Sequence, residues 1–168
     1  MTADRNHRQQ VSLVRIRVAD AMTTGVISCP PETSLQTVAR LMTERRVHAV
    51  YVFDYGSEDD ESVELWGLVS DLDLVAAAQG DIGRRTARDT SVTPLVSVRS
   101  DDSLARAAQL MAEYGVSHLA VLDPVSKRPV GVLSTLDIAR VVANASMADE
   151  LEHPPATAGV EPAAFREH

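Results

Sequence analysis

The sequence predicts a mixed α/β (α+β) protein made of two copies of one β-α-β-β-α unit, packed as a pseudo-twofold pair. Residues 67–75 read GLVSDLDLV and residues 131–139 read GVLSTLDIA, so one pattern of Gly, Ser, Leu and Asp occurs twice. A shift of 69 residues also places 18–54 on 87–123. One unit has too few elements to close a core, but two units can share one. The shifted stretches agree at Asp20, Thr24, Ser28, Ser34, Leu35, Ala39, Leu41, Met42, Glu44, Val47, Val52 and Asp54.

The elements of the first copy follow from its apolar patterning. Apolar residues of 34–46 recur at helical spacing, and Ser34 precedes them as an N-cap. Two β-rich runs flank a polar loop, which indicates a hairpin, because extra residues in a surface loop cost little. The predicted elements are an additional alternating strand at 11–18, a helical turn at 18–22, a short strand at 26–28, the helix at 34–46, strands at 49–54 and 63–70, and a helix at 71–78.

The second copy repeats this order with a shorter hairpin turn, PVSKRP. Its predicted elements are a strand at 95–98, a helix at 103–114, strands at 118–122 and 129–134, and a helix at 135–145. The polar ends of the chain lack periodicity, which is typical of flexible segments. We therefore expect a flexible N-terminal segment at 1–15, repeat 1 at 16–80, repeat 2 at 81–146, and a flexible acidic tail at 147–168.

The composition argues against several classes of protein. No run approaches the roughly 18 consecutive apolar residues of a membrane span, and MTADRNHRQQ does not resemble a signal peptide. The net charge of −8 arises mainly in 54–64 and 149–168, and no basic stripe with interleaved aromatics suits a nucleic acid. The single cysteine, Cys29, agrees with a reducing compartment. We expect a cytoplasmic protein that binds neither membranes nor nucleic acid.

Catalysis is not expected from the side chains available. Cys29 has no identifiable His–acid pair in the sequence, and it is interpreted as a small apolar filler. A dinucleotide-binding fingerprint and a P-loop are both absent. The carboxylates of 58–61, EDDE, resemble a weak Mg²⁺ or Ca²⁺ surface more than a cage. We therefore expect no enzyme activity and no metal site, and a divalent-metal sensor is kept only as an alternative.

Two Ser-x-x-Asp motifs each stand where a predicted strand ends and a helix begins. Ser70 with Asp73, and Ser134 with Asp137, fit the capping box, in which serine and acid satisfy free N–H groups reciprocally. The same position suits a ligand. Helix N-terminal N–H groups attract phosphate, and an aspartate can accept two ribose hydroxyls.

These features together resemble a tandem pair of cystathionine β-synthase (CBS) domains, known as a Bateman module. Each copy opens on an Asp-containing stretch that leads to a short strand, and closes on Gly, two apolar residues and Ser-x-x-Asp, over about residues 16–145. The resemblance implies two clefts between the repeats that bind adenosyl ligands such as AMP, ATP or S-adenosylmethionine. It also implies that Asp73 and Asp137 hold ribose and that Ser70 and Ser134 hold phosphate.

Other positions take roles from the same resemblance, with ordinary packing as the alternative. His118 and Arg140 are candidates for ligand contact, although Arg140 is also placed to pair with Asp137. The second strand often carries proline in the family, whereas Tyr51 and Ala120 stand there, so Tyr51 is expected to fill part of its cleft. The first-strand residues whose backbone contacts the base in relatives are Thr24, Val26, Ile27, Thr93, Leu95 and Val96.

The sequence also predicts a difference between the two sites. Asp71 adds a negative charge beside Ser70, whereas Thr135 is neutral beside Ser134. We expect the phosphate at Ser134 and an uncharged or cationic adenosyl ligand at the other site.

The function expected is a regulatory or sensor module that binds an adenosyl ligand as its effector, with no firmly implied cofactor. The alternative is a ligand-free interaction module that docks on a regulated protein not identified by the sequence. Helices at 72–78 and 136–145 are apolar on more than one face, which predicts a homodimer.

Overall fold

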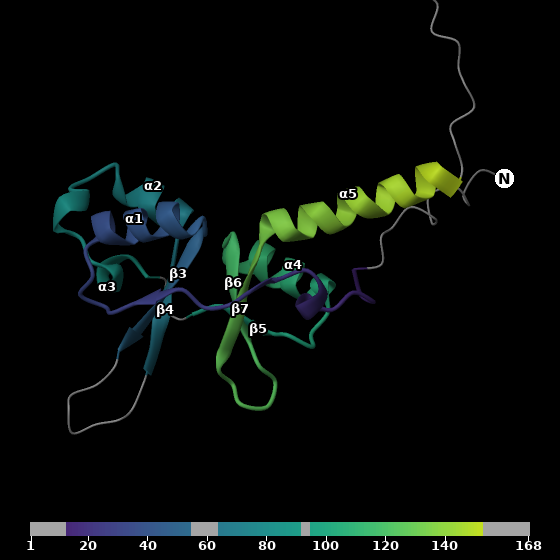
Figure 1. Cartoon of the computed structure of the whole chain (residues 1–168), viewed down its shortest axis with the longest axis horizontal. Helices are drawn as coiled ribbons and strands as arrows, with labels where there is room; N and C mark the ends of the chain where they lie inside the picture. Colours follow the sequence, from purple (N-terminus) through teal and green to yellow (C-terminus); the bar gives the residue numbers. More distant parts are fainter. Residues whose placement is uncertain (1–12, 55–63, 92–94, 153–168) are drawn as a thin grey trace, which may run out of the picture.

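The computed structural model describes residues 13–54, 64–91 and 95–152 of the chain, with side chains described as far as Asn144. These residues form two lobes side by side, each a small sheet with helices packed on it (Figure 1). The mixed α/β architecture predicted from the repeat is confirmed.

The first lobe is built on a three-stranded sheet in the order β2-β3-β4. Strand β2 runs parallel to β3, and β3 runs antiparallel to β4. Its core contains Leu35 and Val38 of one helix packed against Val50, Val52 and Val69 of the sheet. The elements of this lobe are β2 (Ser28–Cys29), α1 (Leu35–Arg45), β3 (Ala49–Asp54), β4 (Glu64–Ser70), α2 (Asp71–Ala77), the 3-10 turn η2 (Ile82–Arg84) and α3 (Ala87–Thr90).

The second lobe is built on a four-stranded sheet in the order β1-β7-β6-β5. Strands β5 and β6 are parallel, and β7 is antiparallel to both of its neighbours. Its core contains Leu104 and Met111 of one helix packed against Leu119, Val121 and Leu133 of the sheet. The elements of this lobe are the 3-10 turn η1 (Val18–Asp20), β1 (Thr23–Thr24), β5 (Ser97–Arg99), α4 (Leu104–Tyr114), β6 (His118–Leu122), β7 (Pro129–Ser134) and α5 (Thr135–Glu152).

Each lobe contains the opening turn of the other repeat. The amide of Val18 donates to the carbonyl of Asp102 at 2.9 Å, and the amide of the corresponding Ala87 donates to Thr33 at 2.8 Å. Val18 is fully buried in the second core and Ala87 in the first. The described part of the first lobe is therefore continuous in sequence. The second lobe is formed by two segments, one that precedes the first lobe in the sequence and one that follows it.

The two sheets meet across a third apolar cluster that contains Tyr51 and Ala120. Tyr51 is fully buried, and its hydroxyl donates to the carbonyl of Gly131 at 2.6 Å and accepts from the amide of Val121 at 3.2 Å. Burial raises the pKa of this phenol. Tyr51 was predicted to fill part of a cleft. It instead joins the two lobes and lines neither of the clefts described below.

The main differences from the sequence prediction lie at the ends of the fold. The additional strand expected at 11–18 is not formed within the described residues, because 13–17 makes turns and a single bridge from Arg17 to Ser103. The Leu13 carbonyl accepts from Ala105 at 3.1 Å, so packing begins before residue 16. Helix α5 continues to Glu152, into the segment predicted to be flexible.

Candidate functional site

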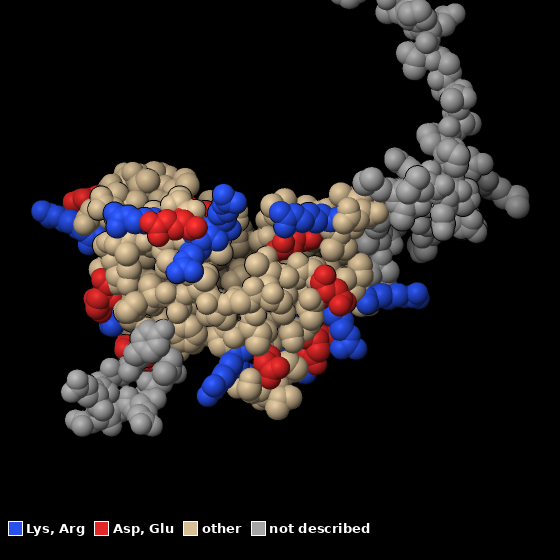
Figure 2. Space-filling view, in the orientation of Figure 1, with Lys and Arg blue, Asp and Glu red and all other residues tan. Residues whose placement is uncertain are grey.

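Two clefts lie between the lobes, one at each Ser-x-x-Asp motif. The first cleft, of about 200 Å³, is lined by Ser70 and Asp73 together with Leu95, Val96 and 114–118. The second cleft has a volume of about 210 Å³. It is lined by Ser134 and Asp137 together with 23–27, 46–49, His118 and Val132. Figure 2 shows a hollow between the lobes with Lys or Arg side chains on both rims.

The clefts combine residues from both repeats. Thr24, Val26 and Ile27 of repeat 1 meet the Ser134–Asp137 motif of repeat 2. Leu95 and Val96 of repeat 2 meet the Ser70–Asp73 motif of repeat 1. At the second cleft this arrangement follows from strand pairing, because Thr23 and Thr24 of β1 pair with Val132 and Gly131 of β7. The remaining predicted first-strand residue, Thr93, lies outside the described residues.

The first motif forms the predicted capping box at the start of α2. The Ser70 amide and hydroxyl each donate to Oδ2 of Asp73 at 2.7 Å, and the Asp73 amide donates to Ser70 Oγ at 3.3 Å. Ser70 is buried and Asp73 is half-buried. Both bonds to the Asp73 carboxylate end on Oδ2, and Asp73 itself lines the first cleft.

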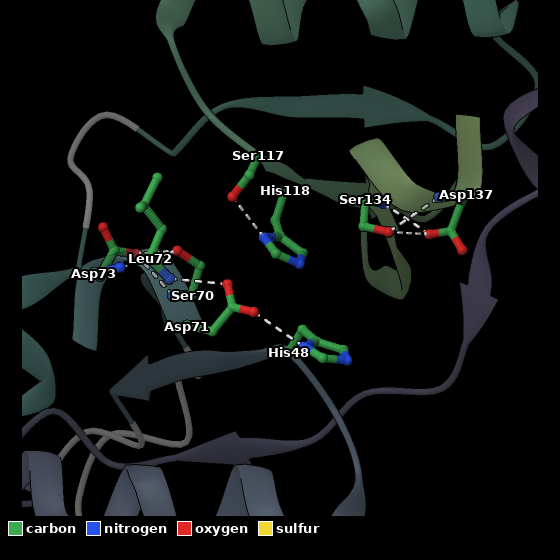
Figure 3. Close-up of polar contacts among 9 residues, drawn as sticks. All are labelled: His48, Ser70, Asp71, Leu72, Asp73, Ser117, His118, Ser134 and Asp137. Atoms are coloured by element: carbon green, nitrogen blue, oxygen red, sulfur yellow. Dashed lines mark hydrogen bonds and ion pairs between the residues drawn. The ribbon is translucent and has the colours of Figure 1, made fainter. Parts of the chain in front are cut away.

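The second motif repeats this geometry at the start of α5, with one addition. The amide and the hydroxyl of Ser134 donate to Oδ2 of Asp137 at 2.8 and 2.7 Å (Figure 3). Arg140 donates to the other oxygen, Oδ1, at 3.1 Å. Asp137 is only 5% exposed, whereas the side chain of Arg140 is 64% exposed. The predicted pairing of Arg140 with Asp137 is therefore present, and Arg140 compensates the charge of this buried carboxylate.

His118 is shared by the two clefts. It lines both of them, and Figure 3 shows its ring between the two Ser–Asp motifs. Its Nδ1 lies 2.9 Å from Ser117 Oγ. Burial lowers the pKa of the imidazole, and the Asp71 carboxylate opposes that shift. The counterpart of His118 in repeat 1 is Ala49, so no second histidine lies at the symmetric place.

The structure places at the second cleft two residues that were not among the predicted site residues. Arg46 and His48 line the second cleft. His48 Nδ1 lies 3.0 Å from Oδ2 of Asp71, so the negative charge predicted beside Ser70 has a partner. A groove of about 480 Å³ adjoins both clefts and contains His48, Asp71, His118 and Thr135. The sequence contains a signal for Arg46 and His48, because the corresponding residues of the other repeat are Gly115 and Ser117.

The described residues do not provide a metal site or a membrane span. Among the described residues no cluster of three His, Cys, Asp or Glu side chains is suited to a metal ion, and the EDDE run at 58–61 lies outside those residues. Burial raises the pKa of the Cys29 thiol, and its packing in the first core fits the role of an apolar filler. Within the described segments no helix has the length and apolarity of a membrane span.

Comparison with known proteins identifies the family. A model of the CBS domain matches residues 18–80 and 87–144. CBS domain-containing protein YhcV of Bacillus subtilis (strain 168) is 32% identical over 124 residues, covering 73% of this chain and 82% of that protein.

Solved structures agree with this assignment. The CBS domain pair of protein MJ0100, in complex with 5′-methylthioadenosine and S-adenosyl-L-methionine, has a TM-score of 0.64 at 20% identity and covers 76% of this chain and 96% of that one. CBSX2 in complex with AMP has a TM-score of 0.57 at 25% identity and covers 78% of this chain and 98% of that one. The chain therefore belongs to the CBS domain family and carries two CBS domains as a tandem pair.

Proposed function

We propose that this chain is a non-catalytic regulatory module of the cytoplasm that binds an adenosyl ligand of the AMP, ATP or S-adenosylmethionine class in the clefts between its repeats. The observation that carries the proposal is the placement of a Ser–Asp capping box at each cleft, together with a short apolar segment from the other repeat. CBSX2, which is similar in fold and 25% identical, has been solved with AMP, and this supports the class of ligand. The buried free thiol of Cys29 suits a reducing compartment.

The chemistry of each cleft suits the parts of an adenosyl group. The apolar side chains of Val26 and Ile27 in the second cleft, and of Leu95 and Val96 in the first, provide walls for a base. The carboxylates of Asp73 and Asp137 lie where they would accept hydrogen bonds from ribose hydroxyls.

The phosphate of a nucleotide fits the second cleft better than the first. Helix α5 has 18 residues and begins at the neutral Thr135, so its N-terminal amides favour an anion. Helix α2 has only seven residues and carries two carboxylates, Asp71 and Asp73, in its first turn, where α5 carries one, Asp137. An uncharged nucleoside, or S-adenosylmethionine with its cationic sulfur, is therefore assigned to the first cleft.

Calorimetric titration of AMP and S-adenosylmethionine tests this assignment. We expect Asp137→Asn to weaken AMP binding and Asp73→Asn to weaken S-adenosylmethionine binding, each by tenfold or more on the basis of about 1.5–3 kcal/mol per hydrogen bond to a charged group. Asp89→Asn is the matched control. Asp89 forms the same capping box with Thr86 at α3 but lines neither cleft. If all three variants bind like the parent, the capping boxes serve folding alone.

We further propose that the chain acts as a homodimer. Leu72 and Val75 of α2 and Leu136 and Val142 of α5 are between 42% and 62% exposed, which leaves apolar helix surface in contact with water. A second copy or a regulated partner protein would cover this surface. Light scattering at micromolar concentration checks the proposal: the parent is expected at twice the mass of one chain, and Leu72→Glu with Leu136→Glu at the mass of one chain. A parent that is monomeric would leave the surface to a partner protein.

A further inference from the structure

The backbone at Arg46 adopts a conformation that side chains rarely tolerate. Helix α1 ends on Arg46 with φ 54° and ψ 44°, in the left-handed region, and its amide donates to the carbonyl of Met42. Helix α4 ends at the corresponding place on Gly115, with φ 63° and ψ 32° and the equivalent bond to Met111. Glycine adopts this conformation without steric cost, whereas a residue with a Cβ does not. Repeat 1 therefore carries arginine at a position that folding alone would give to glycine.

The residue at this strained position borders the second cleft. Arg46 lines that cleft together with Ser134 and Asp137. Two other basic side chains already have acidic partners, because His48 Nδ1 lies 3.0 Å from Asp71 Oδ2 and Arg140 pairs with Asp137. Arg46 itself forms no ion pair with any residue in the described part of the chain. The first cleft has Gly115 and Ser117 at the places of Arg46 and His48, so it lacks this cation.

We propose that Arg46 is the residue that makes the second cleft specific for an adenosine 5′-phosphate. A guanidinium matches the geometry of a phosphate with two parallel N–H donors, and the cost of the left-handed backbone is explained by that use. Arg140 already compensates Asp137, so the net charge left at the cleft for a ligand is that of Arg46. The inference rests on the proposed adenosyl function and attributes the preference of the second cleft for phosphate to the side chain of Arg46.

The substitution Arg46→Gly separates binding from folding. Because glycine relieves the backbone strain, we expect the melting temperature to stay the same or rise. Calorimetric titration is expected to show AMP binding about 10- to 100-fold weaker, the range for losing hydrogen bonds to a charged group. Adenosine, which has the same base and ribose but no phosphate, is expected to bind within about twofold of the parent, because it makes no contact that the variant removes.

Two further variants complete the experiment. Lys127→Gly relieves the other positive-φ residue that is not glycine, φ 60°, in the turn between β6 and β7, and should leave both affinities unchanged. Gly115→Arg places the same cation at the first cleft, where a Cβ would meet no atom within 4 Å but would adopt the same strained left-handed backbone as Arg46. In the Arg46→Gly background it is expected to restore part of the AMP affinity.

The outcomes distinguish the inference from the function on which it rests. If Arg46→Gly binds AMP like the parent, or weakens AMP and adenosine equally, Arg46 does not read the phosphate and the inference is overturned while the adenosyl function stands. If the parent binds neither AMP nor adenosine, the proposed function fails and the inference fails with it. Loss of AMP affinity alone, with adenosine retained, supports both.

Discussion

Removal of one hydroxyl at Tyr51 tests how the two lobes are held together. The phenol of repeat 1 donates to the carbonyl of Gly131 and accepts from the amide of Val121, both in repeat 2, and the side chain is fully buried. Tyr51→Phe keeps the ring and its stacking on Phe53, whose ring centroid lies 6.0 Å away. The substitution therefore removes two hydrogen bonds across the boundary and little else.

The expected loss of stability follows from those two bonds. A net hydrogen bond contributes about 0.5–1.5 kcal/mol, and a buried group left without its partner costs about 1–3 kcal/mol. For one carbonyl and one amide we expect Tyr51→Phe to lower the free energy of unfolding by about 2–4 kcal/mol in total. In a chain of this length such a change corresponds to a melting temperature lower by about 5–15 °C.

Urea unfolding followed by circular dichroism measures this change, with Tyr114→Phe as the control because Tyr114 is 55% exposed. A second signature lies at high pH. Burial raises the pKa of Tyr51 above its ordinary value of 10.0. The contribution of the protonated phenol to the free energy of unfolding is therefore fully present below pH 10 and is lost as the pH rises through the raised pKa. Tyr51→Phe lacks this loss. A change in stability below about 0.5 kcal/mol, as for a surface substitution, would refute the account of Tyr51 as the link between lobes.

Three other predictions concern His118, Gly131 and the acidic segment at 55–62. Burial lowers the pKa of His118 below its ordinary value of 6.5, so its contribution to stability is present above pH 6.5 and is lost as the pH falls toward the lowered value; acid unfolding of His118→Gln should lack this component. A Cβ at Gly131 would collide with the carbonyl of Thr23, so Gly131→Ala should cost about 1–3 kcal/mol in thermal unfolding and weaken AMP binding at the second cleft by displacing β1. Shortening 55–62 should leave the melting temperature within about 2 °C of the parent, because the predominantly polar residues of this segment offer little apolar area to bury.

The repeat in the sequence was sufficient to predict most of the secondary structure. Helical spacing behind Ser34 and the alternation of the β-rich runs are local signals, and α1, β3, β4, α4, β6 and β7 lie where they were expected. The Ser-x-x-Asp motifs were also predicted correctly as capping boxes, since their hydrogen bonds join residues three positions apart.

The features that local patterns do not specify are the contacts between repeats. Nothing in the sequence near Thr24 indicates that it lies by Asp137 and not by Asp73, because that pairing depends on β1 crossing to β7. The role of Tyr51 was missed for the same reason, since its hydroxyl partners lie 70 and 80 residues away. Arg46 has glycine, Gly115, as its counterpart in the other repeat, but the sequence did not show that the residue at this position takes a left-handed conformation beside the second cleft.

The exchange of opening turns makes the first lobe an insertion within the second, and this arrangement has a consequence for folding kinetics. The described part of the first lobe is continuous in sequence, and its last helix is joined to its beginning by the hydrogen bond from the Ala87 amide to the Thr33 carbonyl. The second lobe must pair Thr23 with Val132, which are 109 positions apart. Loop-closure entropy makes such a contact slow to form in an open chain, and a folded first lobe shortens the effective loop. We therefore expect the first lobe to fold first and to bring together the two segments of the second lobe.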